Sequence, residues 1–187
     1  MKTTPSIVIN GETVWLYRVT ERLKDLALPE WERELYLFLN DWFSDSTFIS
    51  AQTSGSTGEP KTIELPKSVM RKSAERTIGY FGLQPTARLL LSLPCRYIAG
   101  KMMVVRAIIG QMSLTAVDPA TGFGFLSHEI YDFGALVPNQ VFKILEQTSG
   151  QQWLQNIRNL LIGGSAISTE LEMQISTLDS RVVSTYG

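Results

Sequence analysis

The residues with the clearest chemical meaning lie in one short polar segment, 53–61, where two glycines stand among four hydroxyl residues and the segment ends in Pro60-Lys61. Glycine lets the backbone approach a ligand closely and turn its N–H groups toward it, and hydroxyl and ammonium groups suit phosphate oxygens. A segment of Thr, Ser and Gly is often only a flexible connector, but Pro60-Lys61 and a predicted strand on each side favour a phosphate-binding loop. We expect the phosphate contacts to come from Thr53, Ser54, Gly55, Ser56, Thr57, Gly58 and Lys61, with Lys61 as the catalytic residue.

A P-loop phosphotransferase is the first alternative for this segment. Counted from Gly55, the Walker A pattern finds Lys61 and Thr62 in place, but Pro60 occupies the second glycine position. Proline has no N–H to donate there. The residues after Lys61 are typical of a strand, so no helix N-terminus would face the phosphates. The pattern therefore disfavours a P-loop.

The elements that must position this loop alternate between strands and helices. Two apolar runs about Asn10-Gly11 predict a hairpin, and the helices that follow are expected at 17–28 and from Pro29 onward. Strands are expected at 47–52, 62–65, 87–93, 113–117, 133–137, 159–162 and 181–185, and helices at 66–81, at 99–109, from Pro138 and near Thr169, where Thr169 and Glu172 could form a capping box. This alternation predicts an α/β fold, a helix-covered, mostly parallel sheet, in one domain over 1–187.

Composition narrows the class of protein. The 187 residues are 44% hydrophobic, enough for a buried core, and 17 basic against 18 acidic residues give a net charge of −1. That balance argues against nucleic acid or an anionic membrane as the main partner. A single cysteine and a single histidine, Cys95 and His128, exclude an intramolecular disulfide and a Cys/His metal cluster, so we predict no metal bound by side chains.

The most apolar stretch, 98–112, carries Lys101 and Arg106 and is too short to span a bilayer. No apolar segment of the signal-peptide type follows Met1, so a cytoplasmic location is expected. We expect Lys101 and Arg106 to lie along the one solvated edge of a buried helix, and Cys95 to be a small core residue.

The loop also resembles a known signature. Ser54-Gly55-Ser56-Thr57-Gly58-Glu59-Pro60-Lys61 is similar to the signature loop of adenylate-forming enzymes, which include acyl- and aryl-CoA ligases, luciferases and the adenylation domains of peptide synthetases. Thr62 replaces the glycine that usually follows the lysine. The resemblance implies that the loop holds the β- and γ-phosphates of ATP, within part of the large N-terminal domain of these enzymes.

Four further segments resemble motifs of this family, in the family's order: 93–100, 136–140, 161–166 and 184–187. The resemblance implies an acyl pocket that includes Tyr97 and Val137. It also implies an adenylate-binding set made of Gly163, Gly164, Ser165, Ala166, Tyr186 and Gly187.

As a function, the resemblance implies an ATP-dependent acid–CoA ligase, with a carboxylic acid, ATP, Mg²⁺ and coenzyme A as its small-molecule partners. The short region before the loop and the 136–140 segment favour the 2-succinylbenzoate–CoA ligase branch of menaquinone biosynthesis. A ligase for another small aryl or fatty acid remains open, as does a non-catalytic nucleotide-binding remnant or split subunit. In the family, a threonine and a glutamate follow Gly187 directly, so we expect this chain alone not to turn over. A homodimer that covers an edge of the sheet is a further possibility.

Overall fold

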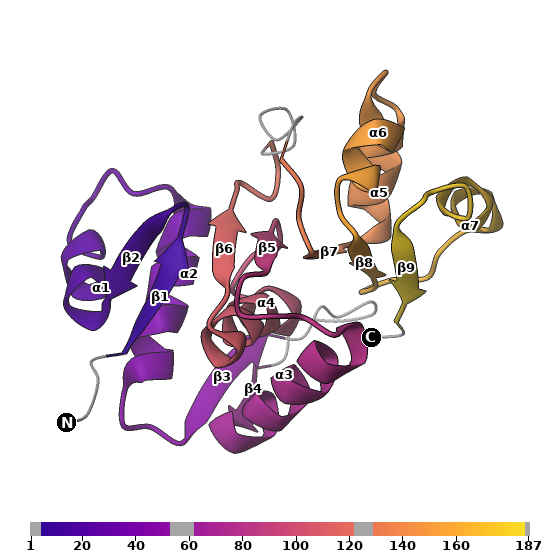
Figure 1. Ribbon diagram of the computed structural model, residues 1–187. Coiled ribbons are helices and arrows are strands. Elements are labelled where there is room, and N and C mark those ends of the chain that lie inside the picture. The colour runs from indigo at the N-terminus through magenta and orange to yellow at the C-terminus, as the bar shows by residue number, and fades with distance from the viewer. Residues whose placement is uncertain (1–4, 53–61, 122–128, 186–187) are drawn as a thin grey trace.

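The computed structural model describes residues 5–52, 62–121 and 129–185, and in these residues a seven-stranded sheet runs through the molecule in the order β2-β1-β6-β5-β7-β8-β9 (Figure 1). Neighbouring strands are parallel except for the β1–β2 hairpin. Strands β3 and β4 form a separate antiparallel pair. The expected helix-covered, mostly parallel α/β sheet is confirmed.

The strands are β1 Ser6–Ile9, β2 Glu12–Trp15, β3 Phe48–Gln52, β4 Thr62–Pro66, β5 Arg88–Leu91, β6 Ser113–Ala116, β7 Phe133–Leu136, β8 Asn159–Ile162 and β9 Arg181–Ser184. The helices are α1 Leu16–Arg22, α2 Glu30–Phe43, α3 Lys67–Phe81, α4 Ile98–Gly110, α5 Pro138–Leu145, α6 Gly150–Gln155 and α7 Thr169–Ile175. In Figure 1 the hairpin and α1 lie at one end of the sheet and α7 lies beside β9 at the other.

Both faces of the sheet are covered, as alternate side chains of β5 demonstrate. Leu89 and Leu91 belong to a core cluster with residues of α2, α3 and α4, whereas Leu90 belongs to a second cluster with residues of α5, α6 and α7. Side chains alternate between the two faces of a strand, so β5 is apolar on both sides, as expected of a central parallel strand.

The N-terminal hairpin follows the Asn-Gly prediction. Asn10 and Gly11 have φ values of +49° and +82°, the left-handed region that a two-residue hairpin turn requires. The Asn10 side chain also accepts a hydrogen bond from the Ala116 N–H at 2.8 Å and donates one to the Ala116 carbonyl at 3.2 Å. The hairpin is thereby fastened to the carboxyl end of β6.

Two sequence predictions of local structure were wrong, and one helix was missed. The helix expected over 17–28 ends at Arg22, because Asp25 accepts a hydrogen bond from the Ala27 N–H at 3.0 Å in a local turn that competes with helical bonding. Ser168, and not Thr169, caps α7, with its hydroxyl accepting from the Leu171 N–H. Helix α6 was not predicted, because its six residues are too few for a helical period to show.

Candidate functional site

The predicted site residues that the structure describes gather at the carboxyl ends of the parallel strands. Of the predicted residues, Val137 follows β7 and Gly163 follows β8. Ser92, after β5, and Thr185, after β9, were not predicted but lie at the same strand ends. The chain passes from β5 to β6 on one side and then crosses to β7 on the other. In open α/β sheets, ligands usually bind at such a reversal, outside the carboxyl ends of the strands.

A buried glutamine joins the strands at this reversal. The Gln140 Nε2 donates to the Ser92 carbonyl at 2.8 Å and to the Pro119 carbonyl at 3.1 Å, and its Oε1 accepts from the Val137 N–H at 3.1 Å. These bonds tie together the segments that follow β5, β6 and β7. Sequence reasoning gave Gln140 no role; only its position three residues after Val137, at the third residue of a helix that opens with Pro138, hinted at a cap.

The glycine turn after β8 packs against its neighbours on both sides. A Cβ on Gly163 would lie 2.2 Å from the Thr185 Oγ1, so any side chain there would require Thr185 to shift. Gly164 has φ +89°, and a Cβ on it would lie 3.4 Å from the Val137 Cγ1. The structure thus brings the predicted pocket residue Val137 beside the predicted adenylate turn, whose Ser165 and Ala166 are exposed.

Tyr97 is half-buried and lies just before α4. Its backbone pairs with Gln52, the last residue of β3, in a parallel bridge, and the Gln52 N–H donates to the Arg96 carbonyl at 3.2 Å. Gln52 directly precedes Thr53, where the predicted phosphate loop begins. Tyr97 and the chain entering that loop are therefore neighbours.

Several predicted residues lie outside the described residues: the loop Thr53–Lys61, His128, and Tyr186 and Gly187. The strand β4 begins at Thr62, directly after Lys61. A P-loop needs a helix there, so the structure agrees with the sequence in disfavouring the Walker A interpretation.

The helix α4 carries two buried cations, and the prediction that they lie on a solvated edge was wrong. Lys101 and Arg106 are each only 8% exposed, because α4 packs against α3, the sheet and Phe38 of α2. The Lys101 Nζ lies 5.0 Å from the centre of the Phe38 ring, and burial lowers its pKa. The Arg106 guanidinium lies 5.5 Å from the Phe133 ring centre, and burial lowers its pKa to about 10.

The thiol of Cys95 is buried as expected, and burial raises its pKa to about 12. It is therefore protonated at neutral pH and unsuited to nucleophilic catalysis.

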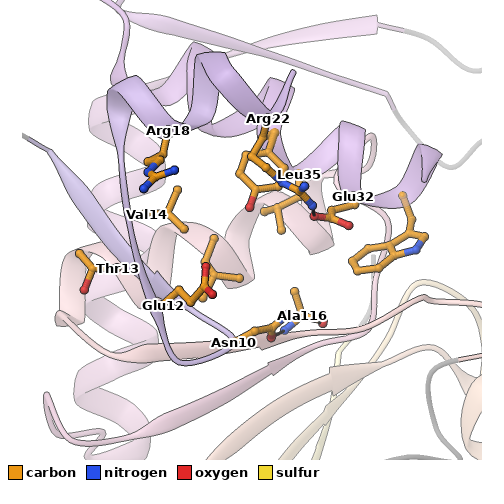
Figure 2. A pocket seen from close by; sticks show the side chains of 12 residues that line it. Asn10, Glu12, Thr13, Val14, Arg18, Arg22, Glu32, Leu35 and Ala116 are labelled. Carbon is orange, nitrogen blue, oxygen red and sulfur yellow. Dashed lines mark hydrogen bonds and ion pairs between the residues drawn. The ribbon is translucent and has the colours of Figure 1, made fainter. Parts of the chain in front are cut away.

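A cavity of about 790 Å³ lies apart from these residues, between the hairpin, α1 and α2 (Figure 2). In Figure 2 its labelled side chains surround an open space, with Arg18 and Arg22 on one side and Asn10 and Ala116 on the other. Arg22 is engaged by Glu32 and Asp25, and Arg18 by Glu21. None of the predicted site residues lines this cavity, so we do not assign the phosphate chemistry to it.

Within residues 5–52, 62–121 and 129–185, no group of three or more His, Cys, Asp or Glu side chains is placed to hold a metal ion. No helix in these same ranges is long and apolar enough to cross a membrane.

Known proteins resemble this chain in sequence and structure. A family model described as AMP-binding enzyme matches residues 40–187. An acyl-CoA synthetase (AMP-forming)/AMP-acid ligase II-like protein from Dyadobacter fermentans is 32% identical, with a TM-score of 0.79, and the match covers 91% of this chain and 49% of that one. This chain therefore spans about half the length of that protein. No curated protein sequence matches significantly.

Two more distant structures share the fold. An o-succinylbenzoate CoA synthetase from Bacillus subtilis, bound with its product analogue, has a TM-score of 0.65 and 24% identity, over 76% of this chain and 30% of that one. ATP-bound MatB from Rhodopseudomonas palustris has a TM-score of 0.61 and 17% identity, over 74% of this chain and 28% of that one.

Proposed function

Because this chain belongs to the AMP-binding enzyme family, we propose that it is the nucleotide-loop portion of an ATP-dependent acid–CoA ligase. In this reaction an acid carboxylate attacks the α-phosphorus of ATP, the bond between the α- and β-phosphates breaks, and pyrophosphate leaves. The thiolate of coenzyme A then attacks the acyl carbon and releases AMP. The carboxylate and the triphosphate are both negatively charged and repel each other. Catalysis therefore depends on positioning the reactants and neutralising their charge.

The observation that carries this proposal is the meeting of predicted residues at one edge of the sheet. Val137 lies beside Gly164, and Tyr97 is bridged to Gln52, directly before the loop. We assign the leaving pyrophosphate to Lys61 and the loop hydroxyls, the adenylate to the turn at Gly163–Ala166 with Tyr186 and Gly187, and the acid to the region between Tyr97 and Val137.

The described residues fit a nucleotide as substrate. The Gly163 backbone lies so close to Thr185 that a side chain there would require Thr185 to shift, and Gly164 has a left-handed backbone with no side chain at the strand ends. We propose that Mg²⁺ arrives with the ATP phosphates, where its role is to neutralise their charge. Coenzyme A supplies the thiol nucleophile as a substrate, consistent with the protonated state of Cys95.

For the acid we propose 2-succinylbenzoate, which would place the enzyme in menaquinone biosynthesis and in the cytoplasm. The support is the 136–140 segment, the short region before the loop and the fold shared with the Bacillus subtilis synthetase. We also propose a homodimer, because β9 is an edge strand of the sheet. Light scattering should then give twice the mass of the chain, and the mass of one chain would contradict the dimer.

The acid assignment is tested by calorimetric titration of 2-succinylbenzoate, benzoate and octanoate into the chain. We expect 2-succinylbenzoate to bind most tightly, and Val137→Trp to weaken its binding at least about tenfold by filling the space beside Gly164. Val69→Trp is the matched control, because Val69 is 54% exposed on α3. If octanoate binds more tightly than 2-succinylbenzoate, the proposed acid is wrong. Equal losses of binding in Val137→Trp and Val69→Trp would contradict an acid pocket beside Gly164.

A further inference from the structure

A glutamate on α2 holds the loop that carries Tyr97. Glu34 accepts two hydrogen bonds from one residue: the Arg96 backbone N–H donates to its Oε2 at 3.2 Å, and the Arg96 Nη1 donates to its Oε1 at 2.9 Å. The Glu34 side chain is only 13% exposed, although the Arg96 side chain is 47% exposed. One carboxylate therefore fixes both the backbone and the side chain of Arg96.

Arg96 in turn contacts Tyr97, a predicted pocket residue, and Gln52, the residue before the predicted phosphate loop. Its guanidinium lies 5.1 Å from the centre of the Tyr97 ring, and its carbonyl accepts the Gln52 N–H. The pKa of Arg96 lies above its ordinary value, first because of a hydrogen bond to the Tyr97 side chain and further because of the nearby Glu34 charge. A displacement of Arg96 would therefore move Tyr97 and Gln52 together.

The same loop also packs against α4. A Cβ on Gly100 would lie 2.4 Å from the Pro94 carbonyl oxygen, which shows how closely the loop packs on the first turn of the helix. The loop is thus held both by α4 and by the Glu34 carboxylate. Exposed ion pairs contribute little by themselves, but this one includes a backbone N–H that would otherwise lose its protein partner.

We propose that Glu34 is a positioning residue that acts through Arg96 to fix Tyr97 and Gln52 at the carboxyl edge of the sheet. The functional consequence rests on the proposed function, since it is the acid pocket and the start of the phosphate loop that Glu34 would align. Glu34 lies outside the 40–187 span that the family model matches. The N-terminal segment of this chain would thereby supply a support for the site that the matched span does not contain.

The test is amide hydrogen exchange by NMR in the full chain, read at the N–H groups of Gln52 and Arg96. We expect Glu34→Ala to accelerate exchange at both positions at least about tenfold, relative to the core amide of Ala135. Glu34→Gln, which keeps one acceptor oxygen, should restore most of the protection. The matched control is Glu32→Ala, because Glu32 lies on the same helix, is 20% exposed and pairs with Arg22, which is 44% exposed.

Exchange at Gln52 and Arg96 that is equal in Glu34→Ala and Glu32→Ala would overturn the proposal. If Glu34→Ala does not fold, Glu34→Gln is compared with Glu32→Gln, and an acceleration smaller than that expected of Glu34→Ala is expected only in Glu34→Gln. A second readout titrates ATP with Mg²⁺, which should bind more weakly to Glu34→Ala than to Glu32→Ala. Altered exchange in a chain that binds no ATP would support the role of Glu34 and contradict the proposed function instead.

Discussion

At the scale of single residues, the environment of a side chain depends on which elements surround it. Cys95 was predicted as a core residue because cysteine is commonly buried, and it is 2% exposed. Lys101 and Arg106 were predicted at a solvated edge, but Lys101 packs against Phe38 of α2 and Arg106 against Phe133 of β7, contacts that no local pattern reveals. The two hydrogen bonds to Glu34 were not predictable either, because Arg96 lies 62 residues further along the chain.

The buried thiol predicts how stability depends on alkaline pH. The pKa of Cys95 rises from an ordinary 9.0 to about 12 in the folded chain, so above pH 9 the unfolded chain releases a proton that the folded chain retains. The folded state then binds more protons, and its stability falls as the pH rises from about 9 to 12. We expect Cys95→Ala to lose about 1 kcal/mol less stability than wild type between pH 8 and pH 10, measured by urea unfolding. Equal losses of stability in wild type and Cys95→Ala over this pH range would show that burial does not raise the pKa of the Cys95 thiol in this way.

At the scale of elements, the sequence predicted most strands and long helices, because apolar periodicity and turn residues are local signals. The Asn10-Gly11 hairpin is confirmed, as is the start of α2 directly after Pro29. The elements that the sequence did not predict depend on tertiary contacts. For example, Gly150 begins α6 where a Cβ would lie 1.7 Å from the Ile144 carbonyl oxygen, and that contact is invisible in the sequence.

Two helical glycines predict opposite effects of the same substitution. Gly100→Ala places a Cβ 2.4 Å from a backbone oxygen that cannot move freely, so we expect a loss of about 2 kcal/mol in the free energy of unfolding. Gly79→Ala meets no atom within 4 Å in α3, so helix propensity should stabilise the chain by up to about 1 kcal/mol. Urea unfolding measures both. If Gly100→Ala were as stable as Gly79→Ala, the close packing of the loop that carries Tyr97 on α4 would be contradicted.

At the scale of the whole molecule, parallel strands carry separated sequence segments to one edge. The motifs around Tyr97, Val137 and Gly163 lie far apart in the sequence, yet each follows or adjoins a strand that ends at this edge. The sequence predicted these segments and the α/β class, but the strand order that places β5 between β6 and β7 came only from the structure. Gln140, which joins the three segments there, was missed for the same reason.

The central claim is that this chain holds ATP phosphates at the Thr53–Lys61 loop, and calorimetric titration of ATP with Mg²⁺ and of pyrophosphate tests it most directly. The account predicts that wild type binds both, and that Lys61→Ala binds at least about tenfold more weakly because it lacks the ammonium group. Lys72→Ala is the matched control, since Lys72 is exposed on α3, and it should bind as wild type does. Equal binding by wild type and Lys61→Ala would contradict the account by placing the phosphates elsewhere. The absence of binding by wild type would contradict it for this chain.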